Sequence, residues 1–316
     1  MTRPAIDEAD FIRLFEEVGP TEIAKRTGVS QKAVYVRRRN IEAKLGRALT
    51  PPDHHANSEP ISTHPGRLHT TVENGVVLVA GDLHAWPGEP STAFRALLRF
   101  CREMQPKVVV MNGDVIDGAT VSRHPPIGWD KLPTLAEELE AASDLLHQLT
   151  LSVPKSTELY WPLGNHDARL ETRIATVAPE LAKMKGTHLR DHFPERFQPC
   201  WSVWVNDVVI KHKPPRGGVH SGHNSTLHAG KTTVSNHLHS LKVTPWTDYG
   251  PTRFGVDAGC LADPYGPQFR YLEDNPRSWR SGFAVLTFRD GRLMWPELLH
   301  VVEPGLAEFR GEWIHV

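Results

Sequence analysis

Apolar residues recur every three to four positions through the first 45 residues, which is the spacing of a buried helix face. Residues 7–18 form the first such segment, and Gly19 and Pro20 end it. Its apolar face consists of Phe11, Leu14, Phe15 and Val18. A second helix is expected over 21–27 and a third over 30–45, with a serine N-cap before it and a glycine after it.

From about residue 68 onward the pattern changes to short apolar runs that alternate with amphipathic segments. Asn74-Gly75 predicts a hairpin turn inside LHTTVENGVVLVAGD, with a strand at 76–80 after it. Helices are expected at about 91–104 and 134–150, each followed by an apolar strand, VVVMNGD and LYWPLGNHD. This alternation predicts a layered α/β fold. The later sequence, from WSVWVNDVVIKHK, is richer in strands and predicts a second sheet packed on the first.

Residues 47–70 separate these two patterns. The segment is rich in Pro, Ser and His and has no apolar periodicity, so we expect a linker there. The predicted organisation is a small all-helical domain at 1–46, the linker, and a larger domain at 71–316.

Charge and cysteine content narrow the class of protein. The net charge of -1 excludes a uniformly basic surface, so any affinity for nucleic acid needs a local patch. Such a patch exists near the N-terminus, where only Glu42 opposes Lys25, Arg26, Lys32, Arg37, Arg38, Arg39, Lys44 and Arg47. The three cysteines form no CxxC pair, and the N-terminus lacks the apolar core of a signal peptide. We therefore expect a cytoplasmic protein without membrane association.

Candidate chemistry gathers at the ends of predicted strands. Three strands run into GDLH, GDVID and GNHD, and two histidine segments, VIKH and NHLH, come later. The residues of interest are Asp82, His84, Asp114, Asp117, Asn165, His166, His212, His237 and His239. Loops after the carboxyl ends of parallel strands converge in one crevice, and the preceding glycines allow tight turns there. Since histidine is the commonest metal ligand, the set predicts a metal site.

The order of these motifs resembles the calcineurin-like metallophosphoesterase superfamily, whose motifs are D-x-H, GDxxD, GNH[DE], a later His, and GHxH. The resemblance covers roughly residues 75–245. It implies a four-layer α/β/β/α fold with two metal ions at one sheet edge. By motif, one metal would be held by Asp82, His84 and His239, and the other by Asn165, His212 and His237, with Asp114 bridging both.

The resemblance also implies a mechanism of phosphoester hydrolysis. Two cations about 3.5–4 Å apart lower the pKa of a shared water, so that hydroxide exists near neutral pH. His166 is similar to the family's histidine that protonates the leaving oxygen or contacts the phosphate, and Asp117 is similar to the acid that orients it. Carboxylate, amide and imidazole ligands suit several metals. Manganese is the first expectation, with iron, zinc or nickel as alternatives.

Two motifs depart from the family pattern. The last reads NHLH rather than GHxH, and Asn236 is expected to keep the turn because Asn tolerates positive φ. The second reads GDVIDG, without the arginine of the phosphoprotein-phosphatase branch, which disfavours a protein phosphatase.

The segment from Pro20 to Arg39 is similar to helix-turn-helix domains of phage and transposase type. Its predicted DNA contacts are Gln31, Lys32 and Tyr35 in a major groove and Arg37, Arg38 and Arg39 at phosphates or base edges. The alternative is a solvated helical surface or a protein-docking domain. His223, in a Gly- and Ser-rich loop, and Arg253 could contact substrate phosphate; the alternatives are a solvated loop and an ordinary salt bridge.

Three functions remain open at this point. The first is a metal-dependent phosphodiesterase acting on DNA, tethered to duplex by its helix-turn-helix. The second is a hydrolase of a small nucleotide-type phosphoester, with the N-terminal domain used only for localisation. The third is a non-enzymatic DNA-binding protein with structural metals. The layout, including SRHPPIGWD, is similar to phosphoesterases carried by phages and prophages, which would place the protein in a host cytoplasm.

Overall fold

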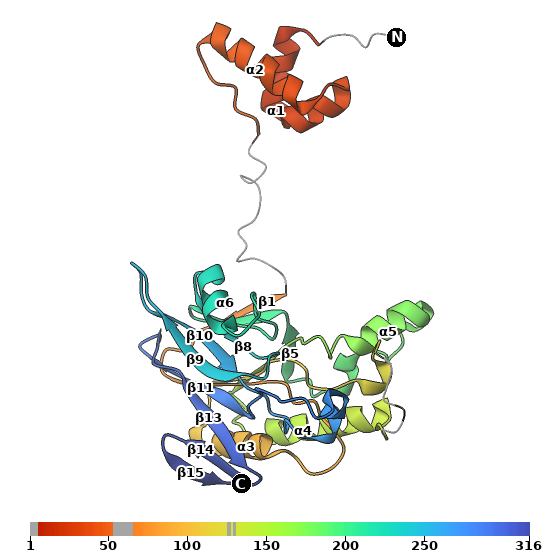
Figure 1. Cartoon of the computed structure of the whole chain (residues 1–316), viewed down its shortest axis with the longest axis vertical. Helices are drawn as coiled ribbons and strands as arrows, with labels where there is room; N and C mark the ends of the chain where they lie inside the picture. Colours follow the sequence, from red (N-terminus) through yellow and green to blue (C-terminus); the bar gives the residue numbers. More distant parts are fainter. Residues whose placement is uncertain (1–5, 53–65, 125–127, 129–130) are drawn as a thin grey trace. The chain divides into compact units, whose positions relative to one another are not determined.

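The computed structural model describes residues 6–52, 66–124, 128 and 131–316 (Figure 1). The chain divides into two compact units, residues 1–63 and 64–316. Most of the expected linker, and part of the SRHPPIGWD stretch, lie outside the described residues.

The first unit consists of α1 (Glu8–Thr27) and α2 (Gln31–Leu45). Gly19, with φ 78° and ψ 174°, interrupts α1 just before Pro20, so the unit has the three predicted helical segments. Its small core is formed by Phe11, Phe15, Ile23, Val34, Ile41 and Leu49. The Ser30 hydroxyl accepts a hydrogen bond from the amide of Ala33 and caps α2.

The second unit contains two sheets. The first has the strand order β1-β6-β7-β8-β10-β9. Its strands are β1 (Arg67–Thr70), β6 (Ser202–Val205), β7 (Val208–Ile210), β8 (Thr232–Ser235), β9 (Leu241–Trp246) and β10 (Arg253–Ala258). The second has the order β15-β14-β13-β11-β2-β3-β4-β5, with β12 paired to β11. Its strands are β2 (Gly75–Ala80), β3 (Val108–Met111), β4 (Glu158–Pro162), β5 (Phe197–Cys200), β11 (Gly282–Arg289), β12 (Arg292–Leu293), β13 (Glu297–Glu303), β14 (Leu306–Phe309) and β15 (Glu312–His315).

Helices cover the outer faces of both sheets. The α-helices are α3 (Thr92–Met104), α4 (Leu135–Leu151), α5 (Arg169–Val177) and α6 (Ser221–Ala229). Short 3-10 turns lie at η2 (Ala119–Val121), η3 (Pro179–Leu181), η4 (Leu189–His192) and η5 (Pro267–Leu272). Helices α3 and α4 share a core with the nine-stranded sheet, and α6 packs on β8, β9 and β10 of the other. The predicted four-layer α/β/β/α fold is confirmed.

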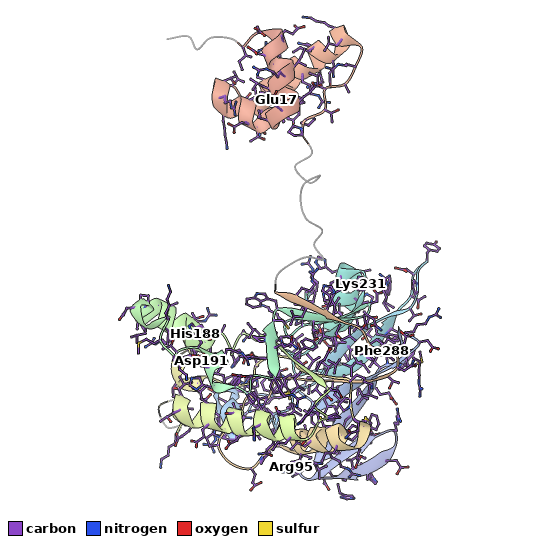
Figure 2. All side chains as sticks on the ribbon, turned by 180° about the vertical axis from the view of Figure 1, so that it is seen from behind. Glu17, Arg95, His188, Asp191, Lys231 and Phe288 are labelled. Atoms are coloured by element: carbon purple, nitrogen blue, oxygen red, sulfur yellow. The ribbon has the colours of Figure 1, made fainter. Side chains whose placement is uncertain are left out.

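Strand β2 shows why the layers form. Val77 and Val79 point into the core between the two sheets, which also contains Phe288 (Figure 2). Leu78 and Ala80 point to the opposite face, into the core with the helices. Successive side chains of a strand face opposite sides, so a run that is apolar at every position is buried on both faces. Within the described residues, no helix is both long and apolar enough to cross a bilayer.

The hairpin predicted around Asn74-Gly75 is wrong. Strand β1 pairs in parallel with β6 in one sheet, whereas β2 pairs with β3 and β11 in the other. Both edges of β2 are occupied by these long-range partners, and the turn carries the chain from one sheet to the other. Strand β1 also occupies residues 67–70, the end of the segment expected to be a linker.

The Gly- and Ser-rich loop predicted at residues 217–231 is also only partly correct, because residues 221–229 form α6. The small polar residues of this helix find partners in the protein. Ser225 exchanges hydrogen bonds with the backbone of Arg216, and Thr226 pairs with Thr233. A polar helix can therefore pack on a sheet without leaving its hydroxyls unsatisfied.

Helix α4 holds the loop after Asp117 through one buried acid. The Glu138 carboxylate accepts hydrogen bonds from the amides of Gly118 (2.6 Å) and Ala119 (3.2 Å) and is fully buried. Burial raises the pKa of Glu138 to about 7; the charge of Asp117 adds to this effect and the two amides oppose it. The carboxyl therefore retains its proton in the folded protein at a pH where the unfolded chain has lost it.

This raised pKa predicts a pH-dependent stability. The stabilising effect of Glu138 is fully present below its ordinary pKa of 4.5 and is lost as the pH rises through about 7. We expect the free energy of unfolding of wild type relative to Glu138→Gln to fall by up to about 3 kcal/mol across this range. All nine tryptophans lie in the second unit, so urea unfolding followed by tryptophan fluorescence reports on that unit. Glu140→Gln, on the exposed face of α4, is the control; a difference that stays constant with pH would contradict the assignment.

Candidate metal centre

The site lies where the carboxyl ends of strands from both sheets meet. Strands β2, β3 and β4 are parallel neighbours, and the loops after them carry Asp82, Asp114 and Asn165. In the other sheet, β7 and β8 are parallel neighbours followed by His212 and by the segment from His237. Parallel pairing therefore brings ligand-type residues from five sequence segments to one place.

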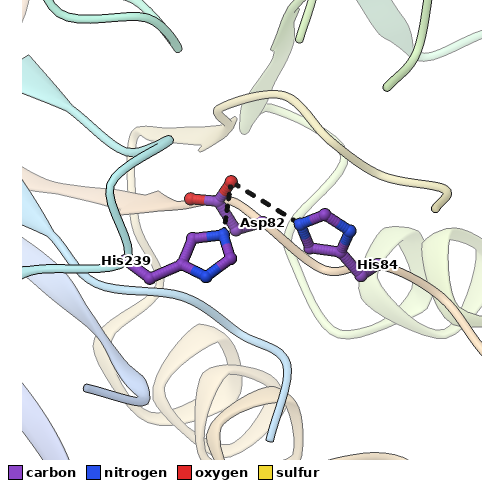
Figure 3. Close-up of side chains that lie close together, drawn as sticks. All are labelled: Asp82, His84 and His239. Carbon is purple, nitrogen blue, oxygen red and sulfur yellow. Dashed lines mark ion pairs between the residues drawn. The ribbon is translucent and has the colours of Figure 1, made fainter. Parts of the chain in front are cut away.

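The first group consists of Asp82, His84 and His239, whose candidate ligand atoms all lie within 4.8 Å of one another. The side chains point toward one another (Figure 3). Oδ1 of Asp82 lies 3.3 Å from Nε2 of His239 and 3.9 Å from Nε2 of His84. All three residues are buried.

The second group consists of Asp114, His212 and His237. Oδ2 of Asp114 lies 3.3 Å from Nε2 of His212, which is also 3.3 Å from Oδ1 of Asn165. The same Oδ2 lies 4.0 Å from Nε2 of His84, a member of the first group. The Asp114 carboxylate thus lies between the two groups.

A third group adjoins them and contains Asp117, His84 and His166. Oδ1 of Asp117 lies 3.0 Å from Nδ1 of His84 and 3.2 Å from Nδ1 of His166. One carboxylate therefore contacts the Nδ1 atoms of two imidazoles, so that in each ring Nε2 is turned away from Asp117. Nε2 of His166 lies 3.8 Å from Asp114 Oδ2, so this nitrogen is close to the second group.

Several buried polar atoms of the site lack partners among the described residues. Asp82 Oδ1, His84 Nε2 and His239 Nδ1 accept or donate no hydrogen bond there. Buried polar atoms are normally satisfied, and each unsatisfied one costs about 1–3 kcal/mol. A divalent cation would satisfy Asp82 Oδ1 and His84 Nε2 together, and His239 faces the same place with its Nε2, so the residues present fit such an ion.

The charges of the site support the same conclusion. Burial raises the pKa of Asp114, but the hydrogen bond and charge of His212 outweigh it and hold the pKa below its ordinary range. Burial lowers the pKa of His212, yet Asp114 and Asp82 raise it to about 9. The acids thus need positive charge beside them, and protonated histidine supplies it when no cation does. Divalent metals compete with protons for such ligands.

The backbone is unusual at the same residues. Five candidate ligands have positive φ: Asp82 (51°), His84 (41°), Asp114 (49°), His237 (70°) and His239 (54°). Non-glycine residues seldom adopt this conformation, and where they do the strain commonly serves a functional site.

Asn236 is absent from the positive-φ residues of the described chain, so the expectation that it keeps a left-handed turn is wrong. Its amide instead accepts a hydrogen bond from Asn112 and donates one to the carbonyl of Gly259.

Glycines permit close approach as well as turns. A Cβ at Gly164 would lie 2.1 Å from Asp114 Oδ1, and one at Gly113 would lie 2.6 Å from the His212 ring. Real Cβ atoms do not come this near to other heavy atoms. These two positions therefore require glycine for the ligands to converge.

Sequence reasoning gave no role to two residues that shape the site. The Asp167 carboxylate accepts hydrogen bonds from the amides of Gly164, Asp114 and Val115 and from the indole of Trp161. It thereby fixes the loop of Asp114 to the loop of Asn165. The Arg169 guanidinium lies 3.1 Å from His166 Nε2 and donates to the carbonyl of Asp117. The acid was visible as the last letter of GNHD, whereas Arg169 belongs to no motif.

Other predicted residues lie outside these groups. His223 is on α6, where its ring packs against Trp246, and Arg253 pairs with Asp248. In the first unit, Arg37 donates to the carbonyls of Ile6 and Asp7, and Arg38 pairs with Glu42. Both arginines also lie over aromatic rings of the helical core. Gln31 donates to Thr21, whereas Lys32, Tyr35 and Arg39 are exposed on α2.

Comparisons with known proteins identify a family model and a phage relative. The family model described as calcineurin-like phosphoesterase matches residues 75–263. The Gene 54 protein of Mycobacterium phage L5 is 26% identical over 246 residues, which cover 68% of this chain and 90% of the relative.

Among solved structures, the chain is similar to Vps29 proteins. Two are from Entamoeba histolytica, a single mutant (16% identity) and the wild type complexed with zinc (17%), and one is from Chaetomium thermophilum (12%). Each alignment covers 76% of this chain and 97–99% of the other, with a TM-score of 0.40.

The segment matched by the family model spans more than half of the chain and contains all members of the three Asp/His groups. Their buried donors fit a divalent cation. The chain therefore belongs to the calcineurin-like phosphoesterase family, and its larger unit is a metal-dependent phosphoesterase domain.

Proposed function

We propose that this protein is a phosphodiesterase that cleaves DNA with two divalent cations, manganese being the first expectation. The observation that carries the proposal is the position of the Asp114 carboxylate between two groups of candidate ligands. One cation would be held by Asp82, His84 and His239, and the other by Asn165, His212 and His237, with Asp114 shared. When bound, such cations neutralise phosphoryl charge and acidify the attacking water.

The protein's own residues would hold the phosphate and move a proton. Nδ1 of His166 lies 2.9 Å from the carbonyl oxygen of Asp117 and 3.2 Å from its carboxylate, which leaves Nε2 on the side of Asp114. As water adds to phosphorus and the bond to the leaving oxygen breaks, His166 would donate the proton that this oxygen needs. Arg169, close to His166, is placed to contact a phosphate oxygen.

Cations around the site support a polyanionic substrate. Lys211 and Lys213 flank His212 in sequence, and Arg67 lies close by. Burial lowers the pKa of Lys211, and repulsion from Arg67 and Lys213 lowers it further. The positive charge of these side chains would attract the phosphates of a nucleic acid.

Features of the N-terminal unit favour DNA as the polyanionic substrate. Lys32, Tyr35 and Arg39 are exposed on α2 at helical spacing, after a serine N-cap. We assign these three residues to DNA contact, Arg39 to phosphate and the other two to the groove. Arg37 and Arg38 are reassigned to the stability of the unit because of their internal contacts.

The division of roles in the centre predicts different outcomes for two substitutions. Asp114→Asn should remove metal and abolish hydrolysis of bis(p-nitrophenyl) phosphate, because both cations depend on it. His166→Ala should keep its metal content and lower kcat by about a hundredfold to ten-thousandfold, the usual contribution of a general acid. Metal analysis and steady-state kinetics provide the measurements.

Asp144→Asn and His147→Ala are matched controls on the exposed face of α4. If His166→Ala loses metal as completely as Asp114→Asn, His166 is a ligand and its assigned role is wrong.

The DNA assignment predicts a salt-dependent effect. In the full-length protein, Lys32→Ala combined with Arg39→Ala should weaken duplex binding and lower the slope of log K against log salt by about 1.8, if each neutralises one phosphate. The control combines Arg13→Ala with Arg26→Ala, whose side chains pair with Asp10 and Glu22. Unchanged affinity and slope in the first variant, or unchanged DNA binding and cleavage without residues 1–46, would contradict the assignment.

A further inference from the structure

A cavity of about 860 Å³ lies beside the metal centre. Three segments line most of it: the loop after β2, the connection between β10 and β11, and the end of β13. Because β11 runs antiparallel to both β2 and β13, these segments meet at the sheet edge that also carries the metal centre. His84 lines the cavity and belongs to two of the Asp/His groups, so cavity and centre are contiguous.

The lining offers aromatic surfaces. Trp86, Tyr265 and Trp279 all border the cavity. Tyr265 is 80% exposed, so much of its ring is accessible to a ligand. Trp86 is partly exposed. Exposed aromatic faces beside a phosphoester site are suited to stacking of a nucleobase.

The aromatic segment is held in place rather than loose. The Arg277 guanidinium lies 5.4 Å from the Tyr265 ring centre and 6.0 Å from that of Trp279, and donates to the carbonyls of Pro264 and Phe269. The Trp279 ring packs at 4.2 Å from that of His239, a candidate ligand. A stacking surface with a fixed position loses little entropy when a ligand binds.

The charges of the lining favour a neutral ligand with hydrogen-bonding groups over a second phosphate. The charged residues at the cavity are Arg95, Arg280, Glu89, Asp263 and Glu303. The three carboxylates outnumber the two guanidiniums, so the net negative charge of the lining would repel a phosphate. Both kinds of group can form hydrogen bonds with base edges and sugar hydroxyls. Arg95 (Figure 2) uses one nitrogen for the carbonyl of Pro90, and no other hydrogen bond of its guanidinium is found among the described residues.

We propose that this cavity binds the base and sugar adjoining the phosphate that is hydrolysed, with the base stacked on Trp86 and Tyr265. The inference rests on the proposed function and narrows its substrate to nucleotides whose base is unpaired, such as a single strand or a frayed end, because a paired base cannot leave its stack. Pockets of 300–1,000 Å³ are typical for small ligands, so the volume is sufficient.

Two kinds of substrate test this proposal with the manganese-loaded full-length protein. The p-nitrophenyl esters of thymidine 5′- and 3′-monophosphate contain base and sugar, whereas bis(p-nitrophenyl) phosphate contains neither. Wild type should prefer one nucleoside ester. In Trp86→Ala and in Tyr265→Ala, the kcat/KM ratio of that ester to bis(p-nitrophenyl) phosphate should fall about tenfold through KM, as expected for one lost stacking surface.

Trp313→Ala, which removes an indole that is 61% exposed on β15, is the matched control and should leave the ratio unchanged. Calorimetry with thymidine 5′-monophosphate and inorganic phosphate gives a second readout. Wild type should bind the nucleotide about tenfold more tightly than phosphate, and both cavity variants should lose this preference.

The two proposals fail in different ways. One outcome is that wild type hydrolyses bis(p-nitrophenyl) phosphate, shows no preference for a nucleoside ester and binds the nucleotide no more tightly than inorganic phosphate. In that case the cavity assignment is wrong and the proposed phosphodiesterase function is retained. If it hydrolyses no phosphodiester yet binds the nucleotide through Trp86 and Tyr265, the function is wrong and the cavity assignment stands. An equal effect of Trp313→Ala on the ratio would also overturn the cavity assignment.

Discussion

Two acids, Asp82 and Asp114, are buried side by side where the two sheets meet, and each keeps its pKa low although burial alone would raise it. Isolated buried carboxylates are costly, so the surroundings must supply positive charge. His212 and His239 supply it in part, and divalent cations at the same atoms would supply more. The need to compensate these acids explains why imidazoles that follow strands of the six-stranded sheet converge on carboxylates that follow strands of the nine-stranded sheet.

The fold provides this convergence and stores strain in doing so. Positive φ at the acids and at His84, His237 and His239 costs of the order of 1–3 kcal/mol at each residue. The apolar layers on both faces of the nine-stranded sheet, and the hydrogen bonds that Asp167 accepts from the neighbouring loops, hold these conformations. Such a scaffold is expected when metal-binding side chains must be positioned before the substrate binds.

Local sequence predicted most of the elements and all members of the Asp/His groups, since apolar runs that end in GD or GN mark strand ends whatever their partners. The predictions from local sequence missed features that depend on contacts between distant segments of the chain. The Asn74-Gly75 turn was assigned to a hairpin because nothing local reveals that both edges of β2 are occupied. The contacts of Arg37 within its own unit were not foreseen either, because its carbonyl acceptors lie about 30 residues away in the chain. Arg169 and the aromatic cavity wall belong to no motif and become visible only when loops meet.

The central claim is that one carboxylate, that of Asp114, joins two metal sites. Electron paramagnetic resonance of metal-stripped full-length protein reloaded with Mn²⁺ tests it most directly, together with a count of bound metal. Cations held about 3.5–4 Å apart by a shared carboxylate interact magnetically. The account predicts two Mn²⁺ per chain and a spectrum of an exchange-coupled pair. One Mn²⁺ per chain, or two that give only the signal of isolated ions, would contradict it.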